Sequence, residues 1–271
     1  KLVFTALKNK KHVVTANKAL IAKYGDQLSK IAEKNKVNLE FEASVCGGVP
    51  IIRTLKEGLI ANKISKIYGI FNGTSNYILS SMDKHNKDFK EVLLDAQKLG
   101  YAESNSSADL NGDDVSSKLK ILSSLCFNSF LNNKIYVEGI NNIDKTDIIN
   151  ANKLGYKIKL LGFAELVSGK FYQRVHPTLI KKDSYVASID GVLNAVITNG
   201  NPVGKSTIQG EGAGAAATTS ALVSDISSIL RGNIKFPFSL SNKERKKIKF
   251  ENITDRFFSA YLRFEVIDKP G

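Results

Sequence analysis

The stretch HVVTANKALIAKYGDQLSKIAEKNKVNLEFEASV, residues 12–45, decides the fold class of this chain. Its first segment, residues 12–16, is rich in β-branched residues and predicts a strand, and residues 39–45 predict a second strand. Between them, apolar side chains recur at the spacing of a helix: Leu20, Ile21, Leu28, Ile31 and Ala32. A strand, a helix and a second strand in this order are the signature of a parallel α/β sheet.

Length and composition indicate a globular protein. The chain has 271 residues, enough for one large domain or two modest ones, and 42% of them are apolar. It contains no apolar run of about 18 residues, so we expect no membrane span. The two cysteines, Cys46 and Cys126, form neither a disulfide framework nor a paired zinc motif, which favours a reducing cytoplasm. Because the sequence begins at Lys1 without a signal peptide, we expect a fragment of a longer protein.

The net charge of +13 predicts a basic surface. Such a surface can meet nucleic acid, an anionic substrate or an anionic cofactor. The basic residues are spread along the sequence except at residues 8–11 and 243–249, and no aromatic-interleaved binding motif accompanies them. A solvated lysine-rich surface is therefore the favoured interpretation, and a nucleic-acid-binding protein is kept as a rival.

The middle of the chain predicts an α+β arrangement. Residues 63–72 predict a strand that ends in an Asn-Gly turn, and three helices follow, over residues 75–85, over residues 88–100 with Asp88 as cap, and after Gly112. Beyond them we expect a short strand at 134–139, a helix over 147–162, and antiparallel strands at 162–167, 172–180 and 190–200.

The last part of the chain predicts a return helix and a tail. Residues 210–230 read as a glycine-led helix of small residues, and residues 232–252 as a polar, basic linker. The final segment, residues 257–271, predicts a lone strand, which cannot bury its apolar face without a following module.

Four carboxylates and one lysine gather in YAESNSSADLNGDDVSSKLKIL, residues 101–122. An EF-hand calcium loop with Gly112 at its sixth position would need a bidentate glutamate at its twelfth, where Lys118 stands. An ammonium cannot bind a cation, so the calcium site is excluded. Asp114 and Lys118 are four residues apart on a helix and share a face. This pair is compatible with acid–base chemistry, with anion binding, or with a salt-bridged surface lysine, which spacing alone favours.

Other candidate residues carry weaker signals. Lys18 follows the first strand, where the carboxyl ends of parallel strands line a ligand crevice. The turn GEGAG, residues 210–214, can bring backbone N–H groups close to a phosphate or nicotinamide, although it does not fit G-x-G-x-x-G. The turn VCGGVP, residues 45–50, can expose carbonyls to a cation. The three histidines show no metal-ligand spacing.

Six segments in order resemble the homoserine dehydrogenase family. They are ALKNKKHVVTANKAL (6–20), FEASVCGGVPII (41–52), GIFNGTSNYIL (69–79), KLGYAESNSSADLNGDDVSSKL (98–119), RVHPTLI (174–180) and GEGAGAAATTSALVSDI (210–226). The resemblance implies interconversion of L-homoserine and L-aspartate 4-semialdehyde with NADP or NAD, in threonine, methionine and isoleucine biosynthesis. It also implies a homodimer or homotetramer with a small-molecule substrate, and no nucleic-acid or membrane partner.

The resemblance also assigns roles to residues. It implies that Lys118 is the proton donor and acceptor at the substrate oxygen, with Glu103 holding the substrate amino group and Asp109 and Asp114 shaping the pocket. Lys18 would lie between substrate and cofactor, and two nearby lysines would lower each other's pKa. The resemblance further implies that Gly214 contacts the cofactor. It also implies that a sodium ion is bound by the backbone carbonyls of Glu42, Val45, Gly47 and Val49.

The implied fold is a partial Rossmann-type nucleotide domain joined to an α+β substrate and dimerisation domain. The expected boundaries are residues 1–45 for the nucleotide-domain remnant, 46–209 for the substrate domain, 210–231 for the return helix, and 232–271 for a linker and the first strand of an ACT-like domain. Two departures stand out. The family's Glu-Pro-Asp-Pro is Glu103-Ser104-Asn105-Ser106 here, and its N-terminal G-x-G-x-x-G turn is absent. A cofactor-deficient fragment of the same fold is therefore a second rival.

Overall fold

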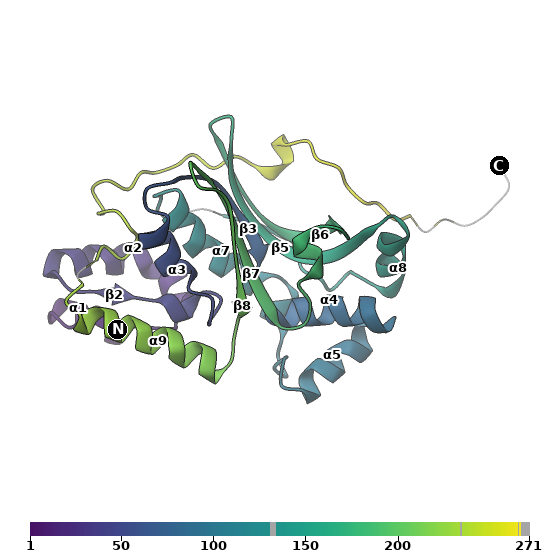
Figure 1. Ribbon diagram of the computed structural model, residues 1–271, viewed down its shortest axis with the longest axis horizontal. Helices are drawn as coiled ribbons and strands as arrows, with labels where there is room; N and C mark the ends of the chain where they lie inside the picture. Colours follow the sequence, from purple (N-terminus) through teal and green to yellow (C-terminus); the bar gives the residue numbers. More distant parts are fainter. Residues whose placement is uncertain (131–133, 234, 265, 267–271) are drawn as a thin grey trace.

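The N-terminal part of the computed structural model contains the expected strand–helix–strand unit. The structure describes residues 1–130, 134–233, 235–264 and 266 (Figure 1). After helix α1 (Leu2–Lys8), strand β1 (Val13–Val14) and strand β2 (Leu39–Glu40) pair in parallel and are joined by helix α2 (Lys18–Asn35). The Asn17 side chain caps α2 by accepting the Leu20 N–H at 2.9 Å.

The second strand is shorter than predicted. Residues Glu42–Ser44 form the 3₁₀ turn η1, and the Glu42 N–H donates to the Asp225 carboxylate at 3.0 Å. The Glu42 side chain in turn accepts the N–H groups of Ile52 and Arg53, at 2.8 and 2.7 Å. These bonds take the backbone out of the sheet and begin helix α3 (Ile51–Arg53), which continues as the π-helical turn η2 (Thr54–Gly58).

A six-stranded sheet forms the larger part of the molecule. Its strand order is β4-β6-β5-β3-β7-β8, and neighbouring strands are antiparallel except for β4 and β6. The strands are β3 (Lys63–Ile70), β4 (Tyr136–Val137), β5 (Tyr156–Val167), β6 (Lys170–Lys181), β7 (Leu193–Asn201) and β8 (Gly204–Glu211). The expectation of an antiparallel α+β middle is therefore confirmed.

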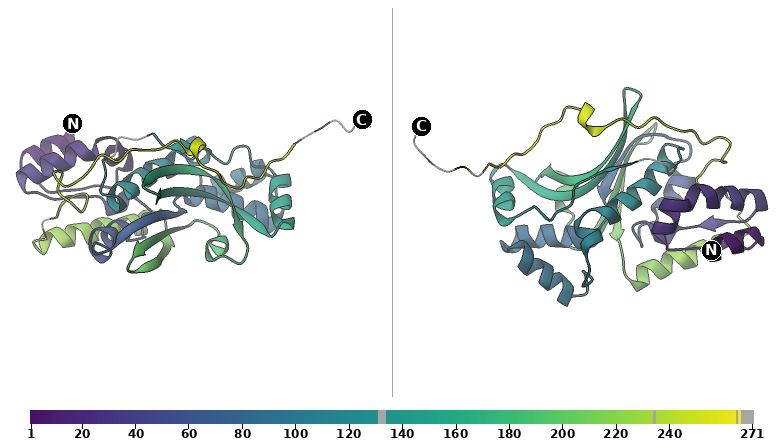
Figure 2. Two further views of the ribbon diagram at one scale, coloured as in Figure 1. Left: turned by 90° about the horizontal axis from the view of Figure 1, so that it is seen from above. Right: turned by 180° about the vertical axis from the view of Figure 1, so that it is seen from behind.

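Helices cover one face of this sheet. Helix α4 (Gly73–His85) and helix α7 (Asp113–Cys126) pack on β5, as does helix α8 (Lys145–Lys153), and helix α5 (Phe89–Lys98) packs on α4. The view from behind in Figure 2 places α4 and α7 in front of the sheet. The remaining short elements are α6 (Ser107–Leu110), η3 (Tyr185–Ser188) and η4 (Ile253–Asp255). Within the described ranges, no helix is both long and apolar enough to cross a membrane.

Several sequence expectations for single elements are wrong. The helix expected over 147–162 stops at Lys153, because Gly155 takes a left-handed φ of +83° and the chain then enters β5. Strand β8 was not expected. Asp88 stands at the start of α5, but its side chain makes no capping hydrogen bond. Residues 257–264 form no strand, and the rest of the predicted C-terminal strand lies largely outside the described residues.

The chain returns to its N-terminal part through helix α9 (Ala215–Leu230), which packs on η1 and β1 (Figure 1). The outgoing crossing, residues 45–50, and the returning crossing, residues 211–214, lie side by side. The Gly48 N–H donates to the Glu211 carbonyl at 2.9 Å. A Cβ on Gly47 would stand 2.8 Å from the Gly212 carbonyl oxygen, so the two crossings touch through backbone alone.

The expected linker, residues 232–252, is irregular but packed. Between residues 235 and 252 it forms only isolated bridges, to Ser129 and to Phe171. Its Phe238 and Arg245 are buried, and Phe238 packs against Phe41 with ring centroids 5.2 Å apart. The segment therefore covers the edge of the N-terminal part before it reaches the large sheet.

A pair of glycines fixes the end of strand β3. Gly69 on β3 and Gly162 on β5 face each other across the sheet. A Cβ on either glycine would come within 2.8 Å of the Phe71 ring, so the absence of side chains lets this ring lie across both strands. The ring position sets the direction in which the chain leaves β3 at residues 71 and 72.

We predict that Gly69→Ala destabilises the protein by about 2 kcal/mol or more, because its Cβ would stand 2.0 Å from the Ala195 carbonyl oxygen of the neighbouring strand. The matched control is Gly58→Ala, where the nearest atom, Thr54 Cγ2, lies 4.0 Å away. This exposed site should change the unfolding free energy by less than about 0.5 kcal/mol. Urea unfolding followed by circular dichroism measures both. Equal stability of the two variants would contradict the close approach.

Candidate active site

A buried carboxylate, Asp114, is the centre of the candidate site. Its Oδ1 forms an ion pair with the Lys18 Nζ at 2.6 Å, and its Oδ2 forms one with the Lys118 Nζ at 2.8 Å. The Asn72 Nδ2 donates to the same Oδ2 at 2.9 Å. The Asp114 side chain is only 4% exposed, so these partners replace the water that a free carboxylate would have.

Three elements bring these groups together. Asp114 and Lys118 lie four residues apart on the first turns of α7, which follows Gly112 in a left-handed conformation. Asn72 stands between β3 and α4, where its Oδ1 accepts the Ser75 N–H at 2.8 Å. Lys18 comes from the start of α2, in the N-terminal part. The predicted grouping of Lys18, Asp114 and Lys118 is therefore present in the structure.

The second acid of the site is Asp109 on the short helix α6. Its Oδ1 accepts from the Asn72 Nδ2 at 2.7 Å, and its backbone carbonyl accepts from the Ser75 hydroxyl at 2.8 Å. The Asp109 side chain is half-buried. Its Oδ2 accepts no hydrogen bond from the residues that the structure describes. This oxygen of Asp109 is therefore open to a ligand.

Lys118 is held as an ammonium. Its side chain is 12% exposed, and its Nζ donates to the Phe71 carbonyl at 2.7 Å as well as pairing with Asp114. Burial lowers the pKa of Lys118, but attraction and hydrogen bonding from Asp114 and attraction from Asp109 outweigh burial, and the net pKa is raised above 10.5. Any opposing effect of a second lysine on this pKa is therefore smaller than the effect of the carboxylates.

The two acids respond differently to their surroundings. Burial raises the pKa of Asp114, but Lys118, Lys18 and the Asn72 hydrogen bond reverse this effect and lower its pKa to about 2. Burial and the neighbouring Asp114 charge raise the pKa of Asp109, against the hydrogen bond from Asn72. The two neighbouring carboxylates thus differ, because the pKa of Asp114 is lowered and the pKa of Asp109 is raised.

Glu103 does not join this cluster. Its side chain is exposed and makes no ion pair or hydrogen bond within the described part of the chain. The loop that holds it is ordered by Asn105, whose Oδ1 accepts from the Ser107 hydroxyl at 2.7 Å, and by the buried Ser106. Asn105, which stands where the family has aspartate, therefore supplies a local hydrogen-bonded turn.

Gly214, predicted to face the cofactor, lies where the returning crossing meets α9, whereas Lys18, the other predicted cofactor residue, lies at the start of α2. Gly214 is exposed at the start of α9 with a φ of +106°, and no atom lies within 4 Å of where its Cβ would stand. Open backbone at the N-terminus of a 16-residue helix fits an anionic or polar cofactor group. In the described residues, the N-terminal part holds one parallel strand pair, β1 and β2, beside this helix.

The four backbone carbonyls predicted to bind a sodium ion lie on one short segment, residues 42–49. The Glu42 and Val49 carbonyls each accept one backbone N–H, from Val45 at 3.3 Å and from Ile51 at 2.7 Å. Those of Val45 and Gly47 accept none among the described residues. A carbonyl oxygen has two lone pairs, so all four retain capacity for a hard cation. No group of three or more His, Cys, Asp or Glu side chains that could hold a metal exists in the described ranges.

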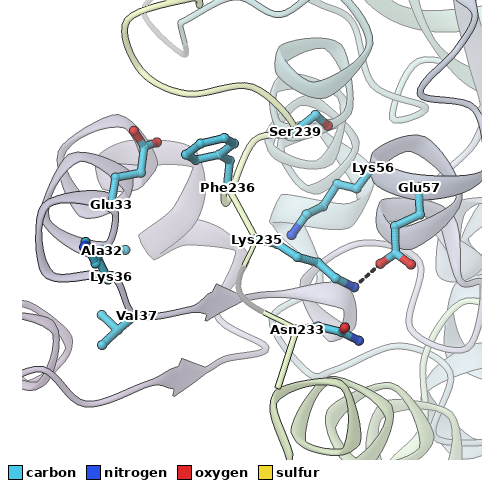
Figure 3. Close-up of a pocket in the computed structure, with 10 residues that line it drawn as sticks. All are labelled: Ala32, Glu33, Lys36, Val37, Lys56, Glu57, Asn233, Lys235, Phe236 and Ser239. Atoms are coloured by element: carbon cyan, nitrogen blue, oxygen red, sulfur yellow. Dashed lines mark hydrogen bonds and ion pairs between the residues drawn. The ribbon is translucent and has the colours of Figure 1, made fainter. Parts of the chain in front are cut away.

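Two surface cavities lie outside the acid–lysine cluster. The first, of about 510 Å³, opens between α2, η2 and the segment after α9, and Figure 3 shows Lys235 in it paired with Glu57. The second, of about 380 Å³, adjoins it along α9 and shares Glu57, Asn233 and Lys235. None of the residues of the acid–lysine cluster lines either cavity. The acidic and basic side chains that do line the cavities largely pair with one another, so neither cavity is the candidate active site.

Sequence reasoning missed Asn72 and Thr74. Asn72 was interpreted as part of a turn, although an Asn directly before a helical stretch is a capping signal. Thr74 donates its hydroxyl to the Tyr101 carbonyl at 2.6 Å and ties α4 to the acidic loop. No local pattern marks this contact, because its partners come from separate elements.

The comparisons with known proteins agree with this architecture. Residues 50–227 match the model of the family described as homoserine dehydrogenase, and residues 1–42 match that of the homoserine dehydrogenase NAD binding domain. The homoserine dehydrogenases of Neisseria gonorrhoeae and Synechocystis are 48% and 43% identical, over 99% and 100% of this chain. The chain spans 63% and 65% of their lengths.

Solved structures show the same fold. The Thiobacillus denitrificans homoserine dehydrogenase superposes with a TM-score of 0.88 at 42% identity, covering 92% of this chain and 60% of that one. A hyperthermophilic archaeal homoserine dehydrogenase in complex with NADPH gives a TM-score of 0.75 at 26% identity, covering 87% of this chain and 69% of that one. The expected fold, a partial NAD-binding domain joined to a catalytic domain with a mixed sheet, is confirmed, and the chain belongs to the homoserine dehydrogenase family.

Proposed function

We propose that the complete protein carrying this chain interconverts L-homoserine and L-aspartate 4-semialdehyde with a nicotinamide cofactor. The observation that carries the proposal is the buried pair of Asp114 and Lys118, joined by the partly exposed Lys18, beside the open oxygen of Asp109. An ammonium at the reacting oxygen and a carboxylate for the substrate's amino group are the two charges that this reaction needs. Family membership supplies the reaction class.

Lys118 is the proposed acid and base. A nicotinamide cofactor, held by Gly214 and Lys18, would supply the hydride for reduction or accept it in oxidation. During reduction, negative charge develops on the substrate oxygen, and the Lys118 ammonium stabilises it and then protonates it. During oxidation, a neutral Lys118 takes the hydroxyl proton. Asp114 keeps the lysine charged and orients it, because both of its oxygens are already used by Lys18, Lys118 and Asn72.

Asp109 is the proposed direct partner of the substrate ammonium. Its Oδ2 is open, whereas both Asp114 oxygens are occupied. Glu103, on the exposed loop, would supply a second carboxylate if that loop folds over the bound substrate. Lys18 would lie between substrate and cofactor, since it reaches the site from the nucleotide-binding side.

The cofactor, cation and assembly remain proposals. NADP or NAD would contact Gly214 and Lys18, and the NADPH complex of the archaeal relative supports this choice. The carbonyls of Glu42, Val45, Gly47 and Val49 would hold sodium. We also propose the domain boundaries given above, a homodimer or homotetramer, a cytoplasmic location and a role in threonine, methionine and isoleucine biosynthesis.

The test of this function is turnover by Lys118→Ala in the complete protein. Loss of the proton donor should reduce kcat by roughly 10²–10⁴-fold while NADPH affinity, measured by fluorescence titration, stays within about twofold. Lys120→Ala, on the same helix, is the matched control and should keep its turnover. Full turnover in Lys118→Ala would exclude the assigned proton transfer, and no turnover in the unmodified protein would exclude the enzyme.

The raised pKa of Lys118 predicts a different pH dependence of kcat for the two directions of the reaction. Oxidation of L-homoserine needs the neutral amine, so its kcat should rise continuously from pH 7 to pH 10. Reduction of L-aspartate 4-semialdehyde needs the ammonium, so its kcat should stay constant over the same range. Initial rates in both directions check this, and a plateau of the oxidation rate near pH 7 would contradict a raised pKa.

A further inference from the structure

Asn72 makes three directional contacts from one small side chain. Its Nδ2 donates to the Asp109 Oδ1 at 2.7 Å and to the Asp114 Oδ2 at 2.9 Å, and its Oδ1 accepts the Ser75 N–H at 2.8 Å. Asn72 is 6% exposed. Both amide hydrogens are therefore used on the two acids of the proposed site.

We propose that Asn72 is a positioning residue of this reaction: its single amide nitrogen holds the carboxylates of Asp109 and Asp114 side by side while leaving both charged. The inference rests on the proposed function, because it concerns the same two acids. It adds a specific role for a residue that touches neither the reacting atoms nor the hydride.

The orientation of the amide follows from its surroundings. The start of α4 presents the Ser75 N–H to the Asn72 oxygen, and the Ser75 hydroxyl binds the Asp109 backbone. With the amide reversed, an oxygen would face two carboxylates and an NH₂ group would face an N–H. The helix start therefore sets the direction of the NH₂ group, and the NH₂ group sets the spacing of the acids.

A neutral donor suits this position better than a charged one. A lysine here would compete with Lys118 for Asp114 and with the substrate ammonium for Asp109. An acid here would add a third carboxylate to a pocket with two lysines, Lys18 and Lys118. The amide satisfies one oxygen of each acid and leaves the Asp109 Oδ2 available.

The experiment compares Asn72→Asp and Asn72→Ser in the complete protein, with kcat and KM for L-homoserine measured from pH 5.5 to pH 9.5. Asp and Ser cap helices about as well as Asn, so both variants keep the acceptor for the Ser75 N–H and lose the NH₂ group. Asn252→Asp is the control, because Asn252 also caps a helical turn, by accepting the Thr254 N–H at 3.3 Å.

We expect kcat/KM for L-homoserine to fall roughly tenfold or more in both Asn72 variants, because the acids lose their common donor. The Asn72→Asp profile should also gain an ionisation between about pH 5 and pH 8, from three carboxylates that share a proton. Asn72→Ser should gain none, and Asn252→Asp should match the unmodified protein.

A capping role alone would leave Asn72→Asp with unchanged kcat/KM and an unchanged pH profile, and that result would overturn the proposal. Failure of the proposed function gives a different result, since the unmodified protein would then have no turnover with L-homoserine. If Asn72→Asp does not fold, Asn72→Ser decides alone: normal kcat/KM in a folded Asn72→Ser protein refutes the positioning role.

Discussion

The removal of the Asp114 charge from water is the constraint on which the rest of the site depends. A buried carboxylate is stable only when it is paired and hydrogen-bonded, and loss of one partner of such a pair costs about 3–5 kcal/mol. Here the partners come from α2, from α7 and from the end of β3. Satisfying one charge therefore joins the nucleotide-binding part, the helical layer and the sheet at a single point.

This arrangement separates the two tasks of an acid–base site. Asp114 keeps its charge down to a pH of about 2, so it acts as a permanent counter-ion for both lysines. Asp109 has a raised pKa and one open oxygen, so it can respond to a bound cation. Asp109 and Asp114 are five residues apart, and their pKa values differ because both oxygens of Asp114 accept from donors whereas only one oxygen of Asp109 does.

Much of the fold could be predicted from the sequence, because the signals were local. Alternation and helical spacing predicted β1, α2, α4 and α7. The first half of β5 was assigned to a helix that runs past Gly155, although residues 156–160 alternate between apolar and polar side chains, and its second half, residues 162–167, was predicted as a strand. The pairing of Asp114 with Lys118 followed from their spacing, and Lys18 was suggested by its place after the first strand as well as by the family resemblance. Asn72 could not be found this way, since its two acids lie on later elements. The position of Glu103 outside the cluster depends on a loop whose path no local pattern sets.

The contact between the two backbone crossings has a mechanical consequence. Gly47 and Gly48 let residues 45–50 touch the backbone of Glu211 and Gly212 without intervening side chains, and a hydrogen bond joins the two crossings. Cys46, on the first crossing, lies close enough to Lys118 for the lysine charge to lower the pKa of its thiol, although burial raises that pKa to about 11. Two hydrogen-bonded backbone segments, and not a single flexible linker, therefore connect the N-terminal part to the large sheet, so Lys18 and Asp114 approach each other from two parts of the chain that are tied at adjacent points.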